Sequence, residues 1–388
     1  MTEYLDISIS SQWTIYLLPV LGFLLGIFLA RRRFKKQKKQ LRFSNDYFQG
    51  LNYLLNDEQD KALDIFIKLV ETDWETIDTS LALGTIFRRN GEIDKAIKLH
   101  QNLLARPSLP AEYKATVLIA LAKDYLQAGW LDRAESLFKD VVGDAEFTSE
   151  AQKCLMSIYE QEQEWENAIN IARRFQSRGA KSLSATTAQY YCELSLQVFN
   201  QNDLKEAEVL ATQALTVNKD CVRASMLLAD IAITRGRYQK AIRFLHQVEI
   251  QNIQLFPLVV EKLVLSYRNT SNLNKALSYL RNLDQKYQEV SLVPVITSLT
   301  SEMFGEEDAL QYLSEAVLRK PSLKSLSTLL KLQTTEIDQF DNLISTVVEA
   351  ITSKNYDFQC ERCGYSANTH VWLCPSCHGW SSMIPKVH

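Results

Sequence analysis

An alanine recurs along most of the chain at a nearly constant interval. The clearest copy of the surrounding pattern runs from Leu83 to Ala96 and reads LGTIFRRNGEIDKA. From one such alanine to the next, the separations are 34, 38, 34, 39, 34, 35 and 33 residues. A period this regular requires one structural unit, repeated and stacked on its neighbours, rather than an irregular helical bundle. The eight alanines are Ala62, Ala96, Ala134, Ala168, Ala207, Ala241, Ala276 and Ala309.

Other positions of the repeat indicate two helices per unit. Twelve residues before the alanine stands a small or medium residue, which lets two helix backbones cross closely. Five residues before it, Gly or Asn tolerates the left-handed conformation that ends the first helix. Apolar residues three before and seven after the alanine suit packing on the next unit. The small residues are Gly50, Gly84, Ala122, Ser195 and Ala229, and the turn residues are Gly91, Gly129, Gly236 and Asn202.

This period and these positions are typical of tetratricopeptide repeats. The sequence therefore predicts an all-α superhelix of about eight or nine helix pairs over residues 46–321. The first helices of such pairs line a groove that binds peptide from other proteins, although the ligand stays unknown. Several candidates, Tyr125 among them, occupy packing positions that favour the core. The groove candidates are Arg88, Arg89, Tyr125, Tyr190, Tyr191 and Arg268.

Four of the seven cysteines lie at the end of the chain, in residues 355–388, which we call the knuckle. Cys360 and Cys363 form one C-x-x-C pair, and Cys374 and Cys377 form a second after ten intervening residues. Gly364 can supply the positive φ that such a turn requires. Four thiolates in this pattern predict one tetrahedral Zn²⁺ or Fe ion, and the pattern alone leaves the choice open. A segment this short is expected to fold only with its metal.

The second cysteine pair also fits another signature, and three cysteines lie outside the knuckle. Cys374-Pro-Ser-Cys377-His378 also fits the attachment signature of c-type haem, but haem leaves the first cysteine pair unexplained. The remaining cysteines, Cys154, Cys192 and Cys221, are expected to be single core residues of a reduced protein.

The N-terminal region predicts a membrane anchor. Residues 13–30 carry no charge, and eighteen helical residues span roughly 27 Å, enough to cross a bilayer. Eight basic residues follow in the segment 31–45, so residues 1–12 are expected outside and the rest of the chain on the cytoplasmic side. Gly22 and Gly26 form a small-x-x-x-small pattern that suits contact with another membrane helix, although glycine is common in such helices.

An apolar helical pattern continues after the repeats, over residues 322–354, and predicts two helices or a degenerate repeat. No Gly/Pro/Ser-rich linker separates this segment from the knuckle, which we therefore expect to dock on the helices. The side chains expected to make that contact are Trp372, Trp380, Tyr365 and Ile384.

The chain has none of the familiar catalytic signatures. There is no Gly-rich phosphate loop, no H-E-x-x-H and no G-x-S-x-G. A net charge of −3 gives no reason to expect nucleic-acid binding. His370 and His378 are at most spare metal ligands. The sequence favours a binding protein over an enzyme.

The combination of these features resembles the lipopolysaccharide assembly protein B (LapB) family of Gram-negative inner membranes. The knuckle carries the most specific part, C-x-x-C-G-Y-x-A followed by W-x-C-P-x-C-x-x-W, which spans Cys360 to Trp380. The resemblance implies a rubredoxin-like metal domain whose four ligands map onto Cys360, Cys363, Cys374 and Cys377.

The resemblance also implies a function. The family acts as an adaptor that promotes degradation of UDP-3-O-acyl-N-acetylglucosamine deacetylase, which commits precursor to lipid A, by a membrane-anchored AAA+ zinc protease of the FtsH type. Members are also implied to coordinate other lipopolysaccharide-synthesis or transport proteins. Two alternatives stay open: a general scaffold for envelope-assembly enzymes, and electron transfer by a rubredoxin-type iron centre.

Overall fold

The computed structural model describes residues 77–107, 109–142, 148–176, 183–287, 290, 292–319 and 357–386, with isolated residues between 49 and 65 and between 325 and 329. The predicted membrane helix with Gly22 and Gly26, the basic segment, most of the first repeat including Ala62, and most of 322–354 lie outside these residues. Within the described part, no helix has the length and apolarity needed to cross a membrane. The chain forms two compact units, Met1–Ile158 and Tyr159–His388, which we treat separately.

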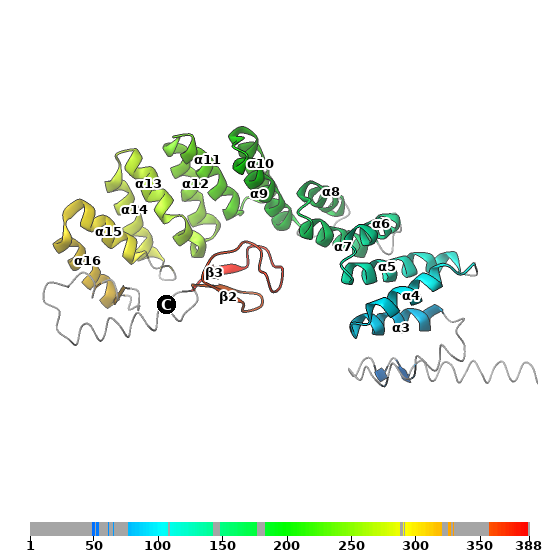
Figure 1. Ribbon diagram of the computed structural model, residues 1–388. Helices are drawn as coiled ribbons and strands as arrows, with labels where there is room; N and C mark the ends of the chain where they lie inside the picture. The colour runs from blue at the N-terminus through cyan, green and yellow to red at the C-terminus, as the bar shows by residue number, and fades with distance from the viewer. Residues whose placement is uncertain are drawn as a thin grey trace, which may run out of the picture. The chain divides into compact units, whose positions relative to one another are not determined.

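The first unit consists of antiparallel helix pairs. Each pair joins a longer first helix to an amphipathic second helix that begins after a tight turn (Figure 1). The helices are α3 (Ile77–Arg89), α4 (Ile93–Leu104), α5 (Ala111–Gln127) and α6 (Leu131–Val141), and α7 (Thr148–Gln161) begins in this unit.

A polar cluster lies inside the first unit, where α3, α4 and α5 meet. Asp124 is fully buried, and Arg88 Nη1 donates a hydrogen bond of 2.7 Å to its Oδ1. The ring of His100, also fully buried, contacts the other carboxylate oxygen through Nδ1. The far side of that ring fills the space beside Gly84, where an added Cβ would lie 2.3 Å from His100 Nε2. The small residue predicted at Gly84 thus makes room for an imidazole.

Gly84→Ala is expected to destabilise the first unit by about 1–3 kcal/mol, because the methyl group overpacks a closed core. Helix propensity alone predicts the opposite sign, a gain of about 1 kcal/mol. Denaturant unfolding of the two proteins distinguishes these effects. A variant as stable as the wild type, or more stable, would show that the His100 ring can move aside.

The second unit continues the same alternation and ends in a small sheet. Its helices are α8 (Trp165–Gln176), α9 (Ser184–Asn200), α10 (Leu204–Val217), α11 (Val222–Thr234), α12 (Tyr238–Gln251), the 3₁₀ helix η1 (Ile253–Leu258), α13 (Val260–Asn269), α14 (Leu273–Lys286), α15 (Val293–Phe304) and α16 (Glu306–Arg319). The apolar core lies between successive helices of α11 to α15, and Phe256, Leu245 and Leu263 are fully buried in it.

The repeat alanine takes the same place in each described copy. It is the fourth residue of α4, α6, α8, α10, α12, α14 and α16, and in every case its exposure is 0%. The predicted close crossing is visible at Ser195, whose Oγ donates a 2.8 Å hydrogen bond to the carbonyl oxygen of Ala207 twelve residues later. The tetratricopeptide prediction is therefore confirmed for the described helices.

The turns confirm the predicted left-handed residues and add others. Gly91, Gly129, Gly236 and Asn202 have φ values of 79°, 78°, 69° and 67°. Gln163 and Ser271 take the same conformation at the same repeat position, with φ values of 58° and 56°. In the last described repeat the residue is Gly305, one place later, with φ 105°. The turn geometry is thus kept even where the sequence lacks Gly or Asn.

Three groove candidates are core residues instead. Tyr125, Tyr190 and Tyr191 are 7%, 0% and 4% exposed, because their positions on the first helices face the neighbouring helices. Arg268 is half exposed and forms an ion pair of 2.6 Å with Glu302 of α15. Arg89 is exposed at the end of α3.

Candidate metal centre and its docking surface

The knuckle contains a three-stranded antiparallel sheet in the order β2-β1-β3. Strand β1 (Phe358–Cys360) is central and pairs Phe358 with Ala367 of β2 (Ser366–Ala367) and with Pro385 of β3 (Met383–Pro385). The strands add a small β element to the predicted all-α fold. Its buried apolar cluster consists of Cys360, Cys374 and Met383. Two of these three are cysteines of the predicted metal site.

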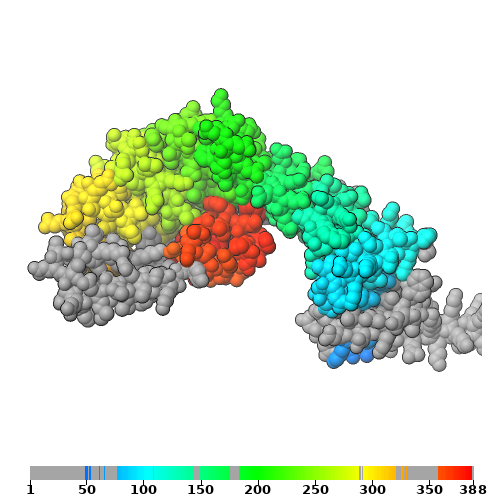
Figure 2. All heavy atoms as spheres, viewed as in Figure 1, coloured from blue at the N-terminus to red at the C-terminus, as the bar shows by residue number. Residues whose placement is uncertain are grey.

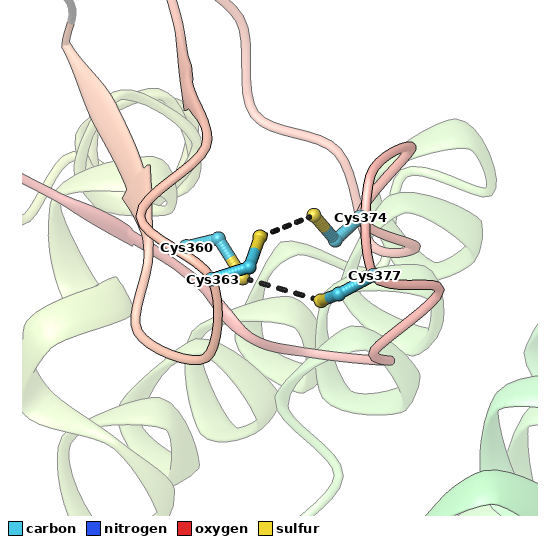
Figure 3. A group of neighbouring side chains, drawn as sticks. All are labelled: Cys360, Cys363, Cys374 and Cys377. Atoms are coloured by element: carbon cyan, nitrogen blue, oxygen red, sulfur yellow. Dashed lines mark hydrogen bonds between the residues drawn. The ribbon is translucent and has the colours of Figure 1, made fainter. Parts of the chain in front are cut away.

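The structure brings the four predicted ligands together (Figure 3). All four sulfur atoms lie within 4.8 Å of one another. Sγ of Cys360 is 3.7 Å from that of Cys377, and Sγ of Cys363 is 3.6 Å from that of Cys374. A tetrahedral ion with metal–sulfur bonds of about 2.3 Å requires sulfur separations of about 3.8 Å. The cluster therefore fits a four-thiolate Zn²⁺ or Fe site, and its geometry does not choose between the two metals.

Both cysteine pairs adopt the same turn. The amide of Gly364 donates to the Cys360 carbonyl, and the amide of His378 donates to the Cys374 carbonyl, each at 2.9 Å. Gly364 and His378 have φ values of 77° and 51°. His378, the residue that completes the haem-like signature, is thus the turn residue equivalent to Gly364. Cys374 belongs to the four-sulfur cluster, which favours the metal prediction over haem.

The surroundings of Cys360 and Cys377 shift the pKa values of these two thiols in opposite directions. The hydroxyl of Ser382, whose Oγ lies 3.2 Å from Cys360 Sγ, is the main factor that lowers the pKa of Cys360 to about 6. The amide of Gly379 acts to lower the pKa of Cys377, but burial and the three neighbouring thiols outweigh it and raise that pKa to about 12. Four thiolates at this spacing need a cation, so metal binding would release protons.

His370 is not one of the clustered ligands. Its ring contacts Phe358 and Trp372 edge-on, with centroid distances of 5.5 and 4.5 Å. Burial lowers its pKa, which favours a neutral imidazole in this apolar setting. His370 therefore packs against the aromatic rings of Phe358 and Trp372.

Trp380 joins the knuckle to the helices of the second unit. Its indole packs edge-on against Trp165 of α8 and Tyr190 of α9, at centroid distances of 6.2 and 6.1 Å. Its Nε1 donates a 3.0 Å hydrogen bond to Glu160 Oε1, and the Tyr190 hydroxyl donates to the same oxygen at 2.5 Å. One carboxylate thus joins α7, α9 and the knuckle.

Two further contacts extend this docking surface, as Figure 2 shows for the knuckle in red against the green helices. Gln189 Nε2 of α9 donates to Ser381 Oγ at 2.9 Å. The guanidinium of Arg223 lies 5.8 Å from the Trp372 ring centroid, and Trp372 packs on the helical core. The predicted docking through Trp372 and Trp380 is therefore present.

The prediction was wrong for Tyr365 and stays a prediction for Ile384. Tyr365 is 39% exposed, and what it contributes is its backbone carbonyl, which accepts a 2.7 Å hydrogen bond from the Cys360 amide. Ile384 lies in β3 opposite Gln359 and is partly exposed, and β3 packs against η1 of the helical array. Tyr365 thus supports the knuckle's own fold, whereas the strand that contains Ile384 also takes part in docking.

Trp380→Ala is expected to loosen the knuckle from the helices while leaving its metal in place. Removal of a partly buried indole and its hydrogen bond costs about 2–3 kcal/mol, which is somewhat less than the cost of removing a fully buried tryptophan. Hydrogen exchange should rise in α9 and in residues 379–382, with unchanged metal content. Tyr365→Ala, which removes an exposed aromatic from the same domain, is the control. Equal exchange in both variants would contradict the docking role of Trp380.

The other three cysteines are only partly as predicted. Cys192 and Cys221 are buried, but they are not single, because their sulfur atoms lie 3.8 Å apart. Cys154 is partly exposed, and burial is the main factor that raises its pKa. None of the three joins the metal cluster.

The fold and site together define a class of protein: a tetratricopeptide array that carries a docked four-cysteine metal knuckle. Family models agree, since the rubredoxin metal binding domain matches residues 358–385 and tetratricopeptide repeats match 79–110 and 199–252. The chain is 30% identical to lipopolysaccharide assembly protein B of Escherichia coli K12 over 95% of this chain and 96% of that protein. It is also 30% identical to the protein of that name in Haemophilus influenzae, over 96% and 97% of the two chains. The chain belongs to the lipopolysaccharide assembly protein B family.

Proposed function

We propose that the chain is a membrane-anchored adaptor, and not an enzyme, that controls lipopolysaccharide levels. It would present UDP-3-O-acyl-N-acetylglucosamine deacetylase to a membrane-anchored AAA+ zinc protease of the FtsH type. It would also coordinate other lipopolysaccharide-synthesis or transport proteins. Family membership supports the link to lipopolysaccharide, because the curated relatives are named for its assembly.

The observation that carries the proposal is the docked state of the knuckle. Trp380 lies against Trp165 and Tyr190, so the metal domain and the array present a joint surface within the second unit. A joint surface of this kind suits binding of a folded client. Electron transfer would use the exposed cysteines, Cys363 and Cys377, as the route for the electron. It does not explain why the knuckle docks extensively on the helices.

The predicted N-terminal anchor gives the proposal its location. Residues 13–30 would cross the inner membrane with residues 1–12 in the periplasm, and the basic residues of 31–45 would hold the array and the knuckle on the cytoplasmic side. A membrane protease and a soluble client could then meet on one scaffold. Contact through Gly22 and Gly26 would bring a second membrane helix close.

Affinity purification of the full-length protein from detergent-solubilised membranes tests the proposal. We expect the protease, the deacetylase or both to be recovered with the wild type and with Tyr365→Ala. Cys360→Ser, which removes a ligand, should lose at least one of them and lengthen the half-life of the deacetylase in cells.

The alternatives predict other outcomes of the same experiment. Recovery of envelope-synthesis enzymes alone, with an unchanged deacetylase half-life, would favour the general scaffold. A red, iron-loaded protein that copurifies with a reductase would favour electron transfer. Zinc in the protein from cells would exclude redox work at this site, since Zn²⁺ has no accessible second state.

A further inference from the structure

A hollow of about 440 Å³ opens on the second unit between α14, α15 and α16. Arg281 and Gln285 line it from α14, Thr300 and Phe304 from α15, and Tyr312 and Arg319 from α16. It is separate from the metal centre and from the docking surface of the knuckle, since it shares no residue with either.

Within the described part of the chain, Arg281 lines this hollow without a carboxylate partner and with one nitrogen that makes no hydrogen bond. One of its terminal nitrogens, Nη2, donates to Thr300 Oγ1 at 3.1 Å, and the guanidinium lies 5.2 Å from the Tyr312 ring centroid. Its Nε is buried and has no hydrogen-bond partner. Among the described residues, no carboxylate forms an ion pair with Arg281. A half-buried guanidinium without a counter-ion is costly unless a ligand supplies the charge.

The other charges around the hollow do not neutralise Arg281. Asp284 of α14 is buried; its Oδ2 accepts a 2.5 Å ion-pair contact from Arg319, and its Oδ1 has no hydrogen-bond partner in the part of the chain that the structure describes. Asp308 and Glu315 are exposed at the edge, where water screens them. Burial is the main factor that raises the pKa of Tyr312 to about 12, so its ring presents a neutral face to the guanidinium.

The hollow also has an apolar edge. Phe304, the last residue of α15, lines the hollow with 57% of its surface exposed. A ligand that pairs a carboxylate with an adjacent aliphatic group would satisfy Arg281 and cover Phe304 at once. Acidic peptide segments that contain leucine or a similar residue have this chemistry.

We propose that this hollow binds a carboxylate side chain of an acidic, partly apolar peptide segment in a partner protein, with Arg281 as the anion-binding residue and Phe304 as the apolar contact. The inference deepens the proposed adaptor function, on which it rests, by assigning a partner-binding site outside the knuckle.

Fluorescence anisotropy with the full-length protein in detergent micelles tests the assignment. The probe is a fluorescein-labelled, end-capped octapeptide of alternating aspartate and leucine, and its counterpart carries asparagine for aspartate. Arg281→Met keeps the side-chain volume but removes the charge. The matched control is Arg243→Met, at an exposed arginine of α12 outside the hollow. Phe304→Ala changes an exposed position, so it should not disturb folding.

The aspartate peptide is expected to bind the wild type and Arg243→Met equally, and Arg281→Met about tenfold or more weakly. Phe304→Ala should weaken binding several-fold, and the asparagine peptide should bind at least tenfold more weakly than the aspartate peptide. The assignment is overturned if the wild type binds neither peptide, binds both equally, or matches Arg281→Met. Because the assay contains no protease and no deacetylase, such a failure leaves the proposed function to its own test.

Discussion

Removal of the metal from the knuckle is expected to unfold residues 357–386 and to leave the helices of the second unit folded. Two of the three buried members of the knuckle's apolar cluster, Cys360 and Cys374, are predicted ligands, so little apolar area remains without the ion. The strands are two or three residues long and cannot hold the sheet alone. Binding of a structural Zn²⁺ contributes about 10–16 kcal/mol of apparent folding free energy at pH 7.

Loss of the metal should also release the knuckle from the array. The docking residues Trp372, Trp380 and Ser381 lie immediately around the second ligand pair. The amide of Cys374 donates to the Gly379 carbonyl at 3.0 Å, and the amide of Ser381 donates to the Trp372 carbonyl at 2.7 Å. These bonds fix the indoles relative to the sulfur cluster, so the contact with α9 depends on the folded metal turn.

Hydrogen exchange before and after chelation measures both effects. Protection should disappear from β1 and β3 and decrease in α9, while far-UV circular dichroism changes little because the helices remain. Cys360→Ser should reproduce the chelated state without chelator. The matched control is Cys192→Ser, at a buried cysteine outside the cluster, which should keep its metal. Persistent protection of β1 and β3 in metal-free protein would contradict the prediction.

The parts of the structure that the sequence predicted correctly are those set by local spacing. A repeat alanine, a left-handed turn residue and a C-x-x-C pair each depend on residues within about a dozen positions. Their structural roles can therefore be recognised from the sequence alone. Trp372 and Trp380 could be expected to dock because large indoles near a metal turn need covering, and the turn itself leaves no room inside.

The residues that sequence reasoning missed act across long separations. Glu160 meets Trp380 220 positions later, and Gln189 meets Ser381 192 positions later. A glutamate or a glutamine on a helix carries no local sign of such a partner. The same reason explains the error at Tyr365, whose backbone and not its ring supports the fold. Only the packing of the chain reveals these roles.

His100 and Asp124 are the clearest example, and they lead to the second large effect. Asp124→Ala is expected to destabilise the first unit by about 3–5 kcal/mol, because it leaves Arg88 and His100 beside a buried site without the carboxylate that they share. This is a large fraction of the stability of an ordinary domain, about 5–15 kcal/mol. Denaturant unfolding, followed by a probe in the first unit such as Trp130, measures the loss.

Asp124→Asn separates the charge from the side-chain volume, and Asp140→Ala is the control. Asp124→Asn keeps the shape and one acceptor but removes the charge, so it should lie between Asp124→Ala and the wild type. Asp140→Ala, at an exposed position of α6, should change the free energy of unfolding by less than about 0.5 kcal/mol. If Asp124→Ala behaved like Asp140→Ala, the buried cluster would contribute nothing to stability.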